Sequence, residues 1–278
     1  MKITPEFFFD TADTVAIKKI WEKLQLFCKP EYCVGITTNP NALAKVNCHT
    51  LNNFESLVKD MAVTLESIRG PGSLIYVQVP NSTMSENEII KWVKYISQLD
   101  TGTSKIALKL PHFSYILNLL DDPLFKNIYV NITGISDFGT ICRVMNQNNV
   151  FYASIIPGRM EEVGIDANAH LRYITDTEFK PYQKVITGSM RTIEGLKSSV
   201  YYKTVPTIGT RVWDLFETLN LWKEFTSYWN NVYNGVKTEQ KDFCPETTIK
   251  NIQLSQSFFE QMDTLGERLY ADFKSKMS

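Results

Sequence analysis

A lysine lies within an apolar stretch, residues 104–111, that has the composition of a buried strand. Leu108 and Leu110 flank this residue, Lys109, on either side. A buried ammonium group is unfavourable unless it is paired, faces a polar cavity or loses its charge. Burial lowers the pKa of a lysine, and the neutral amine that results can attack a carbonyl to form a Schiff base. The alternative is a structural lysine that pairs with a carboxylate or extends its head group to solvent at the end of the strand.

Polar side chains follow several other apolar stretches in the same way. These residues are Asp10, Thr38, Asn39, Gln78, Asn131, Thr133, Ser154, Arg159, Ser189 and Arg191. Where such stretches are the strands of a β/α barrel, their carboxyl ends meet at one mouth, and the side chains line one pocket. A lysine nucleophile, a carboxylate, and hydroxyl or amide groups that hold a water are the parts of a Schiff-base aldol site. Two arginines suit a phosphate, which guanidinium groups bind through paired hydrogen bonds.

Each of these residues also has a purely structural interpretation. Asp10 and Asp13 are of the type that caps helices. Arg159 can form a surface ion pair with the glutamates two and three positions later in the chain. The segment 38–40 has the composition of a turn.

The apolar stretches alternate with helix-like patterns. The strands expected are residues 7–9, 33–37, 74–79, 104–111, 128–133, 150–156, 184–188 and 201–205. Such alternation predicts a parallel sheet with crossover helices, and eight repeats predict an α/β fold of the (β/α)8 TIM barrel type. The alternative is an open doubly wound sheet, but the first turn, residues 10–13, lacks the glycines usual in that fold.

The chain divides into a barrel, residues 1–210, and a helical C-terminal extension, residues 211–278. The extension is rich in aromatic residues, and its segment 234–248 has the composition of a polar loop. Its last helix is amphipathic and includes Phe258, Phe259 and Met262. So many apolar side chains are expected to pack on the barrel or on a neighbouring subunit.

Composition bounds the classes of function. The net charge of −1 gives no basic excess, so nucleic acid is not an expected partner, and no stretch approaches the length of a membrane span. The five cysteines are scattered with no C-x-x-C pair, which disfavours a zinc site or a disulfide framework and favours a reducing compartment. The first residues lack the apolar run of a signal peptide. We therefore expect a cytoplasmic protein.

Six short motifs, in this order, resemble the transaldolase family, especially its short-chain branch, which includes fructose-6-phosphate aldolase. They are Phe9-Asp10-Thr11-Ala12-Asp13, Gly35-Ile36-Thr37-Thr38-Asn39-Pro40, Lys109-Leu110-Pro111, Val130-Asn131-Ile132-Thr133, Gly158-Arg159-Met160-Glu161-Glu162 and Gly188-Ser189-Met190-Arg191. The matches spread over roughly residues 7–210, and the first two motifs together are a specific signature. With this resemblance, a catalytic Lys109 becomes the preferred interpretation.

The resemblance implies a transferase that forms a Schiff base between Lys109 and a ketose phosphate. It implies that Asp10 is the general acid and base, and that Gln78 and Thr133 position the water that relays protons. Because the lysine itself serves as the electron sink, neither a metal nor an organic cofactor is implied. The substrates implied are the sugar phosphates of the pentose phosphate pathway, sedoheptulose 7-phosphate or fructose 6-phosphate as donor and an aldose phosphate as acceptor.

The same resemblance assigns the binding residues. Thr38 and Asn39 would contact the dihydroxyacetone moiety, which Asn131 and Ser189 would also line. Arg159 and Arg191 would hold the phosphate of the acceptor. Ser154 matches the serine of transaldolases rather than the alanine of the aldolase branch.

The sequence departs from the family pattern at three places. Ile156 stands where an aromatic residue is usual, Gly134 stands where a larger apolar residue is common, and the C-terminal segment is longer than in short transaldolases. In that branch the terminal helix packs on a neighbouring subunit, so a homo-oligomer is compatible with the sequence. Two alternatives to a transaldolase stay open. One is a fructose-6-phosphate aldolase that releases dihydroxyacetone, and the other is a barrel that binds sugar phosphates without turnover.

Overall fold

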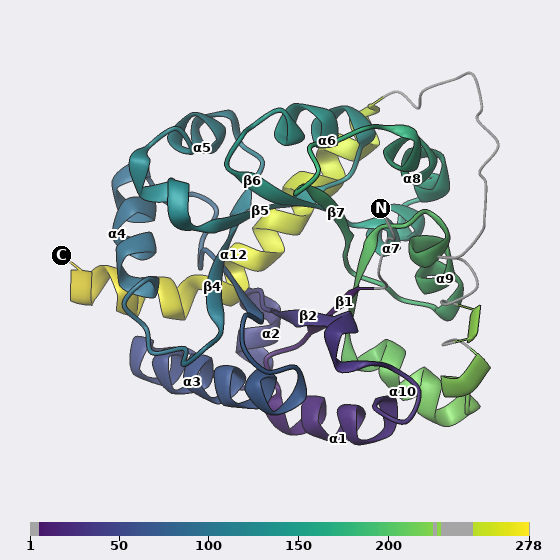
Figure 1. Cartoon of the computed structure of the whole chain (residues 1–278). Helices are drawn as coiled ribbons and strands as arrows, with labels where there is room; N and C mark the ends of the chain where they lie inside the picture. Colours follow the sequence, from purple (N-terminus) through teal and green to yellow (C-terminus); the bar gives the residue numbers. More distant parts are fainter. Residues whose placement is uncertain (1–5, 225–226, 229–246, 278) are drawn as a thin grey trace.

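Eight parallel strands close into a barrel in the computed structural model, which describes residues 6–224, 227–228 and 247–277 (Figure 1). The strands are β1 (Phe7–Asp10), β2 (Cys33–Thr37), β3 (Leu74–Gln78), β4 (Lys105–Pro111), β5 (Tyr129–Ile135), β6 (Val150–Ile155), β7 (Lys184–Thr187) and β8 (Val205–Ile208). Each strand pairs with the next in the chain, and β8 pairs with β1. The predicted (β/α)8 barrel is confirmed, and the open sheet is wrong.

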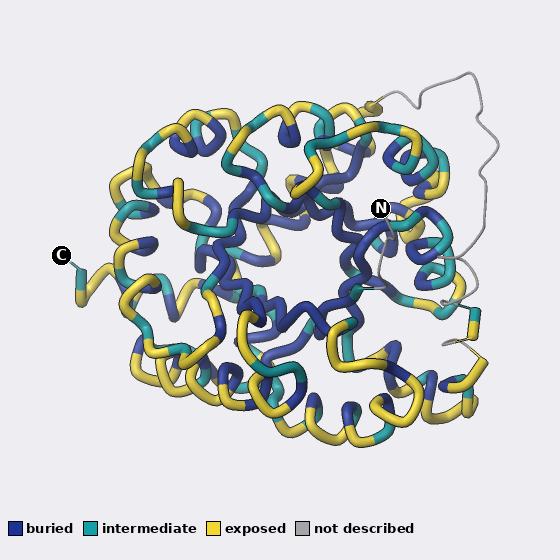
Figure 2. The backbone as a smooth tube through the Cα atoms, in the orientation of Figure 1, coloured by how far each residue is buried: buried dark blue, intermediate teal, exposed yellow. Residues whose placement is uncertain are grey.

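Helices surround the barrel and connect its strands. They are α1 (Thr14–Leu24), α2 (Pro40–Lys45), α3 (Leu51–Ile68), α4 (Glu86–Ile96), α5 (Ser114–Leu119), α6 (Phe138–Met145), α7 (Pro157–Glu162), α8 (Ala167–Asp176), α9 (Ile193–Tyr201), α10 (Thr210–Leu219) and α12 (Ile249–Met277), with short 3-10 turns at Pro30–Tyr32 and Pro123–Asn127. Figure 2 shows the consequence of their amphipathic patterns, because the inner ring is buried and the outward helix faces are exposed.

Side chains at strand ends begin several of these helices. The Asp13 carboxylate accepts the Ala16 N–H at 2.9 Å and caps α1, so the structural interpretation of Asp13 is correct. Asp10, in contrast, ends β1 and caps no helix. The Asn39 amide oxygen caps α2 by accepting the Ala42 N–H at 2.9 Å.

The eighth strand begins later than the sequence predicts. The predicted strand 201–205 shares only one residue with β8, Val205, which is the first residue of β8. Tyr201 is the last residue of α9, and the Tyr202 N–H donates to the Ser198 carbonyl oxygen at 2.9 Å. Lys203 then takes a left-handed φ of 54°, which ends the helix. The tyrosines have high strand propensity, but here they continue the helix and Tyr202 is buried, so packing overrides propensity.

Aromatic side chains fill the middle of the barrel. Phe8, Tyr76 and Tyr152 meet edge to face, with ring centroids 5.2, 5.6 and 5.8 Å apart. Successive side chains of a strand point to opposite faces, so the residue two positions later faces the same interior. Asp10, Gln78 and Ser154 each stand two residues after one of these rings. The aromatic layer is therefore the floor beneath a layer of polar residues.

The long helix α12 crosses the mouth of the barrel at the carboxyl ends of the strands, from near α6 to near α3 and α4 (Figure 1). The Asp263 carboxylate accepts the N–H and the hydroxyl of Ser82, just after β3, both at 2.6 Å. The Ser255 hydroxyl donates to the Gly134 carbonyl oxygen in β5 at 2.8 Å. This helix thus contacts the barrel of its own chain at several strand ends.

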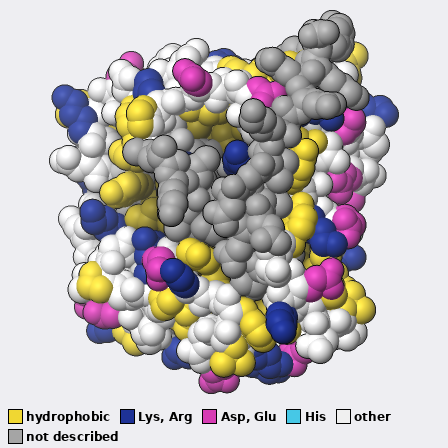
Figure 3. Space-filling model, turned by 45° about the vertical axis from the view of Figure 1, so that its right-hand side comes forward, with side chains coloured by type: hydrophobic (Ala, Val, Ile, Leu, Met, Phe, Trp, Pro, Cys, Tyr) yellow, Lys and Arg dark blue, Asp and Glu magenta, His cyan; other side chains and the backbone are white. Residues whose placement is uncertain are grey.

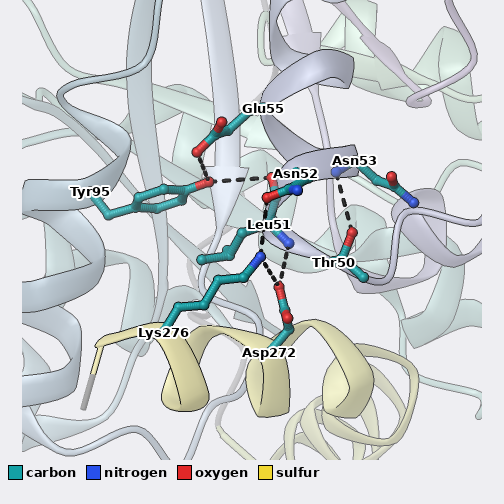
Figure 4. Close-up of polar contacts among 8 residues, drawn as sticks. All are labelled: Thr50, Leu51, Asn52, Asn53, Glu55, Tyr95, Asp272 and Lys276. Carbon is teal, nitrogen blue, oxygen red and sulfur yellow. Dashed lines mark hydrogen bonds and ion pairs between the residues drawn. The ribbon is translucent and has the colours of Figure 1, made fainter.

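The C-terminal part of α12 is fixed to the start of α3 (Figure 4). The Asp272 carboxylate accepts the Leu51 N–H at 2.7 Å and pairs with Lys276 at 3.0 Å. Lys276 also donates to the Asn52 side chain at 3.1 Å. These contacts hold the C-terminal end of α12 against the first turn of α3. An oligomer formed through this helix stays a prediction, and residues 234–246 of the predicted polar loop lie outside the described residues.

Two glycines let α12 approach the barrel closely. Gly134 has a φ of +77°, and a Cβ there would lie 2.3 Å from the Phe259 ring. At Gly266 a Cβ would lie 1.9 Å from the Pro80 carbonyl oxygen. Gly134 is one of the departures from the family pattern, and the aromatic side chain of α12 occupies the space that a larger residue would take.

We expect Gly266→Ala to lower the free energy of unfolding by about 1–3 kcal/mol, because the clash is with backbone rather than with a movable side chain. Alanine favours a helix over glycine by about 1 kcal/mol, so helix propensity alone predicts the opposite sign. Denaturant unfolding measures the difference, with Glu267→Ala at the neighbouring exposed position as control. A Gly266→Ala protein as stable as the wild type would contradict this docking of α12.

The distribution of surface charges and the character of the helices agree with what the sequence predicts. Acidic and basic side chains are interspersed over the face shown in Figure 3. None of the described helices combines the length and the apolar character needed to cross a membrane.

Candidate active site

The polar layer above the aromatic floor spans adjacent strands in register. Gln78 is paired with Lys109 across β3 and β4, and Lys109 with Asn131 across β4 and β5. Thr133 lies two residues beyond Asn131 and so faces the same side. All four are buried, with Lys109 7% exposed. The strand register thus brings these predicted residues to one level of the barrel.

Lys109 has only neutral hydrogen-bond partners. Its Nζ donates to the Thr37 hydroxyl at 3.3 Å and to the Thr38 carbonyl oxygen at 3.2 Å. Within the described part of the chain it forms no ion pair, so the structural alternative of a lysine paired with a carboxylate is disfavoured. Burial lowers the pKa of Lys109, and the charge of Asp10 opposes this only in part. The amine therefore loses its proton more readily than an exposed lysine does.

Asp10 is held loosely and is partly buried. Its carboxylate accepts from the Asn39 side-chain amide and from the Thr207 hydroxyl, both at 3.5 Å. Burial raises the pKa of Asp10 above the ordinary 3.8, although the charges of Lys109 and Arg191 work in the opposite direction. A carboxyl group that keeps its proton to higher pH is better suited to transfer protons near neutrality.

Two other buried side chains in the layer differ in their hydrogen bonding. The Ser154 hydroxyl donates to the Asn131 side-chain oxygen at 2.8 Å. The Gln78 Oε1 atom is buried, and the described residues offer it no hydrogen-bond partner. A buried acceptor without a partner costs about 1–3 kcal/mol, so Gln78 is a candidate to bind a water or a substrate hydroxyl.

A cavity of about 120 Å³ adjoins Asp10. Of the predicted residues it is lined by Asp10, Asn39, Arg159, Ser189 and Arg191, whereas Lys109 is not part of its wall. Asp10 is electrostatically coupled to both Lys109 and Arg191. The predicted residues therefore form two groups, the polar layer around Lys109 and the basic cavity, and Asp10 belongs to both.

The two arginines of the cavity have different partners. Arg191 donates from Nε to the Glu162 carboxylate at 2.9 Å. Arg159 donates from Nη1 to the Gln261 side-chain oxygen at 2.8 Å and forms no ion pair within the described residues, so the structural alternative, a surface pair with Glu161 or Glu162, is disfavoured. Burial lowers the pKa of Arg159, and the charge of Arg191 lowers it further. Two guanidinium groups in one cavity favour an anion between them.

Part of the cavity wall forms where the loop after β7 closely approaches the start of α7. Ser189 has a left-handed φ of 57°, and a Cβ at Gly158 would lie 2.0 Å from the Ser189 carbonyl oxygen. Glycine at position 158 thus lets the loop after β7 contact the start of α7. The contact sets Arg159 and Arg191, which follow these two residues, on the same cavity.

Thr38 and Asn39 have structural roles at the site. The Thr38 hydroxyl donates to the Tyr76 carbonyl oxygen at 2.9 Å. Asn39 caps α2, and its amide nitrogen reaches Asp10. Residues 38–40 thus connect β2 directly to α2 with Asn39 as the helix cap, and the same segment also contacts both Lys109 and Asp10. Ile156 is buried and apolar, and can shape the pocket only by packing.

Sequence reasoning missed several residues of the cavity. Its wall also includes Lys45 from α2, Arg211 from α10, and Phe258 and Met262 from α12. Lys45 stands at no strand end, and Arg211 follows β8, which begins and ends later than the strand predicted there. Helical periodicity marks Phe258 and Met262 only as apolar. Nothing in the spacing indicates that α12 crosses the mouth.

The described residues contain no group of three or more His, Cys, Asp or Glu side chains that could hold a metal ion. No family model matches the chain, and the search of curated proteins also finds no match. What the site does is therefore inferred from its own residues.

Proposed function

We propose that this barrel is a transaldolase, which transfers a dihydroxyacetone unit from a ketose phosphate to an aldose phosphate through a Schiff base on Lys109. The observation that carries the proposal is a buried lysine with no ion-pair partner among the described residues, whose pKa is lowered by burial. The family resemblance of the motifs around Asp10, Thr38 and Lys109 supports the same activity.

The reaction begins with attack of the neutral Lys109 amine on the ketose carbonyl carbon. Asp10 donates a proton as the carbinolamine loses water, and the Schiff base forms. A base then removes the proton of the C4 hydroxyl, the C3–C4 bond breaks, and the aldose phosphate leaves. The electron pair of that bond stays on the enamine attached to Lys109.

The second half reverses these steps with another aldehyde. The enamine carbon attacks the acceptor carbonyl, the new alkoxide takes a proton, and water hydrolyses the Schiff base. Gln78 and Thr133 are the residues we assign to hold the water that carries protons to and from Asp10. Their burial, and the unpartnered oxygen of Gln78, support this assignment.

The basic cavity suits the phosphate of both substrates. Arg159 and Arg191 line the cavity, and Asp10 connects the cavity to the polar layer around Lys109. With the phosphate there, the carbonyl end of the sugar extends toward Lys109. Ser154 and Asn131, which are hydrogen-bonded to each other, would line the dihydroxyacetone unit.

Borohydride reduction tests the proposal. After incubation with fructose 6-phosphate and reduction, we expect a stable adduct on Lys109, found by mass spectrometry of the digested protein. Lys105, an exposed lysine on the same strand, is the internal control and stays unmodified. The absence of an adduct on Lys109 with several ketose donors would refute the Schiff base. Adding erythrose 4-phosphate or glyceraldehyde 3-phosphate then distinguishes transfer from the release of dihydroxyacetone by an aldolase.

A further inference from the structure

We propose that Gln261 of α12 is a positioning residue, which holds Arg159 toward the substrate phosphate without neutralising its charge. The inference rests on the proposed function, since it concerns the phosphate of that substrate. It makes the C-terminal helix a part of the substrate site of its own barrel.

Two contacts of the Arg159 guanidinium group and one donor without a partner carry the inference. Nη1 donates to the Gln261 side-chain oxygen at 2.8 Å, and the guanidinium carbon lies 5.0 Å from the centre of the Phe258 ring. The third donor, Nε, is buried and has no hydrogen-bond partner among the described residues. A buried N–H without a partner is unfavourable, and Arg159 lines the cavity, so an anion bound there would supply the missing acceptor.

The helix α12 is fixed to the barrel on both sides of Gln261 and can therefore hold Arg159 in place. Arg159 itself stands on α7, which has only six residues. In contrast, α12 has 29 residues and is fixed on one side of Gln261 by Ser255 and on the other by Asp263 and Asp272. Gln261 and Phe258 therefore place the guanidinium group from a more rigid element than its own.

Because Gln261 is neutral, the two arginines differ in how strongly they attract an anion. Arg191 is paired with the Glu162 carboxylate, which offsets part of its charge. Arg159 is held by an amide and an aromatic ring and forms no ion pair within the described residues, so more of its charge remains for a ligand, although Glu162 and Asp10 act on it from a greater distance. We therefore assign Arg159 the stronger attraction for the phosphate.

Titration with inorganic phosphate tests this without any turnover. We expect Gln261→Leu, which keeps the bulk but removes the acceptor, to weaken phosphate binding about three- to tenfold. Gln261→Glu keeps the hydrogen bond but adds a negative charge, and should weaken binding at least as much. Gln256→Leu, at an exposed glutamine five positions earlier on the helix, is the matched control and should bind phosphate like the wild type.

A kinetic comparison separates positioning from a general effect on folding. In Gln261→Leu the KM for glyceraldehyde 3-phosphate should rise about three- to tenfold, while the KM for unphosphorylated glyceraldehyde and the kcat stay unchanged. Equal effects on both acceptors, or a phosphate affinity unchanged in Gln261→Leu, would overturn the inference. Wild-type affinity in Gln261→Glu would overturn the claim of a neutral support.

The two proposals fail in different ways. If no adduct forms on Lys109 but the Gln261 variants weaken phosphate binding, the transaldolase activity is wrong and the role of Gln261 stands. If the adduct forms and the Gln261 variants bind phosphate with wild-type affinity, only the role of Gln261 is wrong.

Discussion

Replacing Lys109 by methionine should reduce turnover by about 10⁴-fold or more while the chain still folds, because the variant lacks the amine that forms the Schiff base. Methionine keeps an unbranched apolar stem, which can occupy the buried space that Lys109 fills. Steady-state kinetics with fructose 6-phosphate and erythrose 4-phosphate measure the loss. Circular dichroism and thermal unfolding establish that the fold is retained.

The stability of Lys109→Met has a predictable pH dependence. The pKa of Lys109 in the folded protein is lowered from the ordinary 10.5, so between these two values the unfolded chain binds more protons than the folded one. The stability of the wild type therefore rises with pH through that window. Methionine removes this unfavourable contribution, so the variant should be at least as stable near neutral pH, and its advantage should shrink as the pH approaches 10.5.

A second lysine on the same strand provides the control. Lys105 is exposed at the start of β4, and Lys105→Met should keep nearly full activity. Loss of activity in both variants would point to damage of the strand rather than to the Schiff base. An active Lys109→Met protein would exclude Lys109 as the nucleophile.

The polar layer around Lys109 could be predicted because side chains alternate between the two faces of a strand. Gln78, Lys109 and Asn131 all follow apolar strand residues. Their positions in the alternation of side chains along each strand place them on the interior face. The closed barrel then brings them to one level without any further information. For such residues, local pattern and fold class together are sufficient.

The remainder of the site depends on contacts between distant parts of the chain. The partner of Arg159 is Gln261, 102 positions away, and no periodicity relates the two. The space that Gly134 leaves for Phe259 has its cause in the docking of α12, so the sequence showed only an unusual glycine. The shifted eighth strand has the same origin, because the packing of Tyr202 outweighed its strand propensity.

Asp10→Asn should reduce turnover by about 10²–10⁴-fold, the usual contribution of a positioned general acid or base. Asparagine preserves the shape, and its oxygen can still accept from the Asn39 amide. Its NH2 group can only donate, to the Thr207 hydroxyl oxygen, and it cannot exchange a proton with the substrate. Steady-state kinetics measure the drop. The adduct on Lys109 should still form after longer incubation, because the amine is intact.

The stability of Asp10→Asn is not expected to fall together with its turnover. Burial raises the folded-state pKa of Asp10 above 3.8, so the folded protein binds a proton that the unfolded chain releases in that window. The stability contributed by this proton is complete below pH 3.8 and is lost as the pH rises through the folded-state pKa. Above that window Asp10→Asn, which buries no charge, should be at least as stable as the wild type. A slow but stable variant would thus separate catalysis from folding.

Asp13 supplies the matched comparison. It is the same residue type three positions later, and its carboxylate caps α1. Asparagine is about as good a cap as aspartate, so Asp13→Asn should change neither stability nor turnover appreciably. If Asp10→Asn lowered turnover by less than about threefold, far below the usual range for a general acid or base, Asp10 would be a structural residue like its neighbour. A large drop confined to Asp10→Asn would instead show that position 10 takes part in proton transfer.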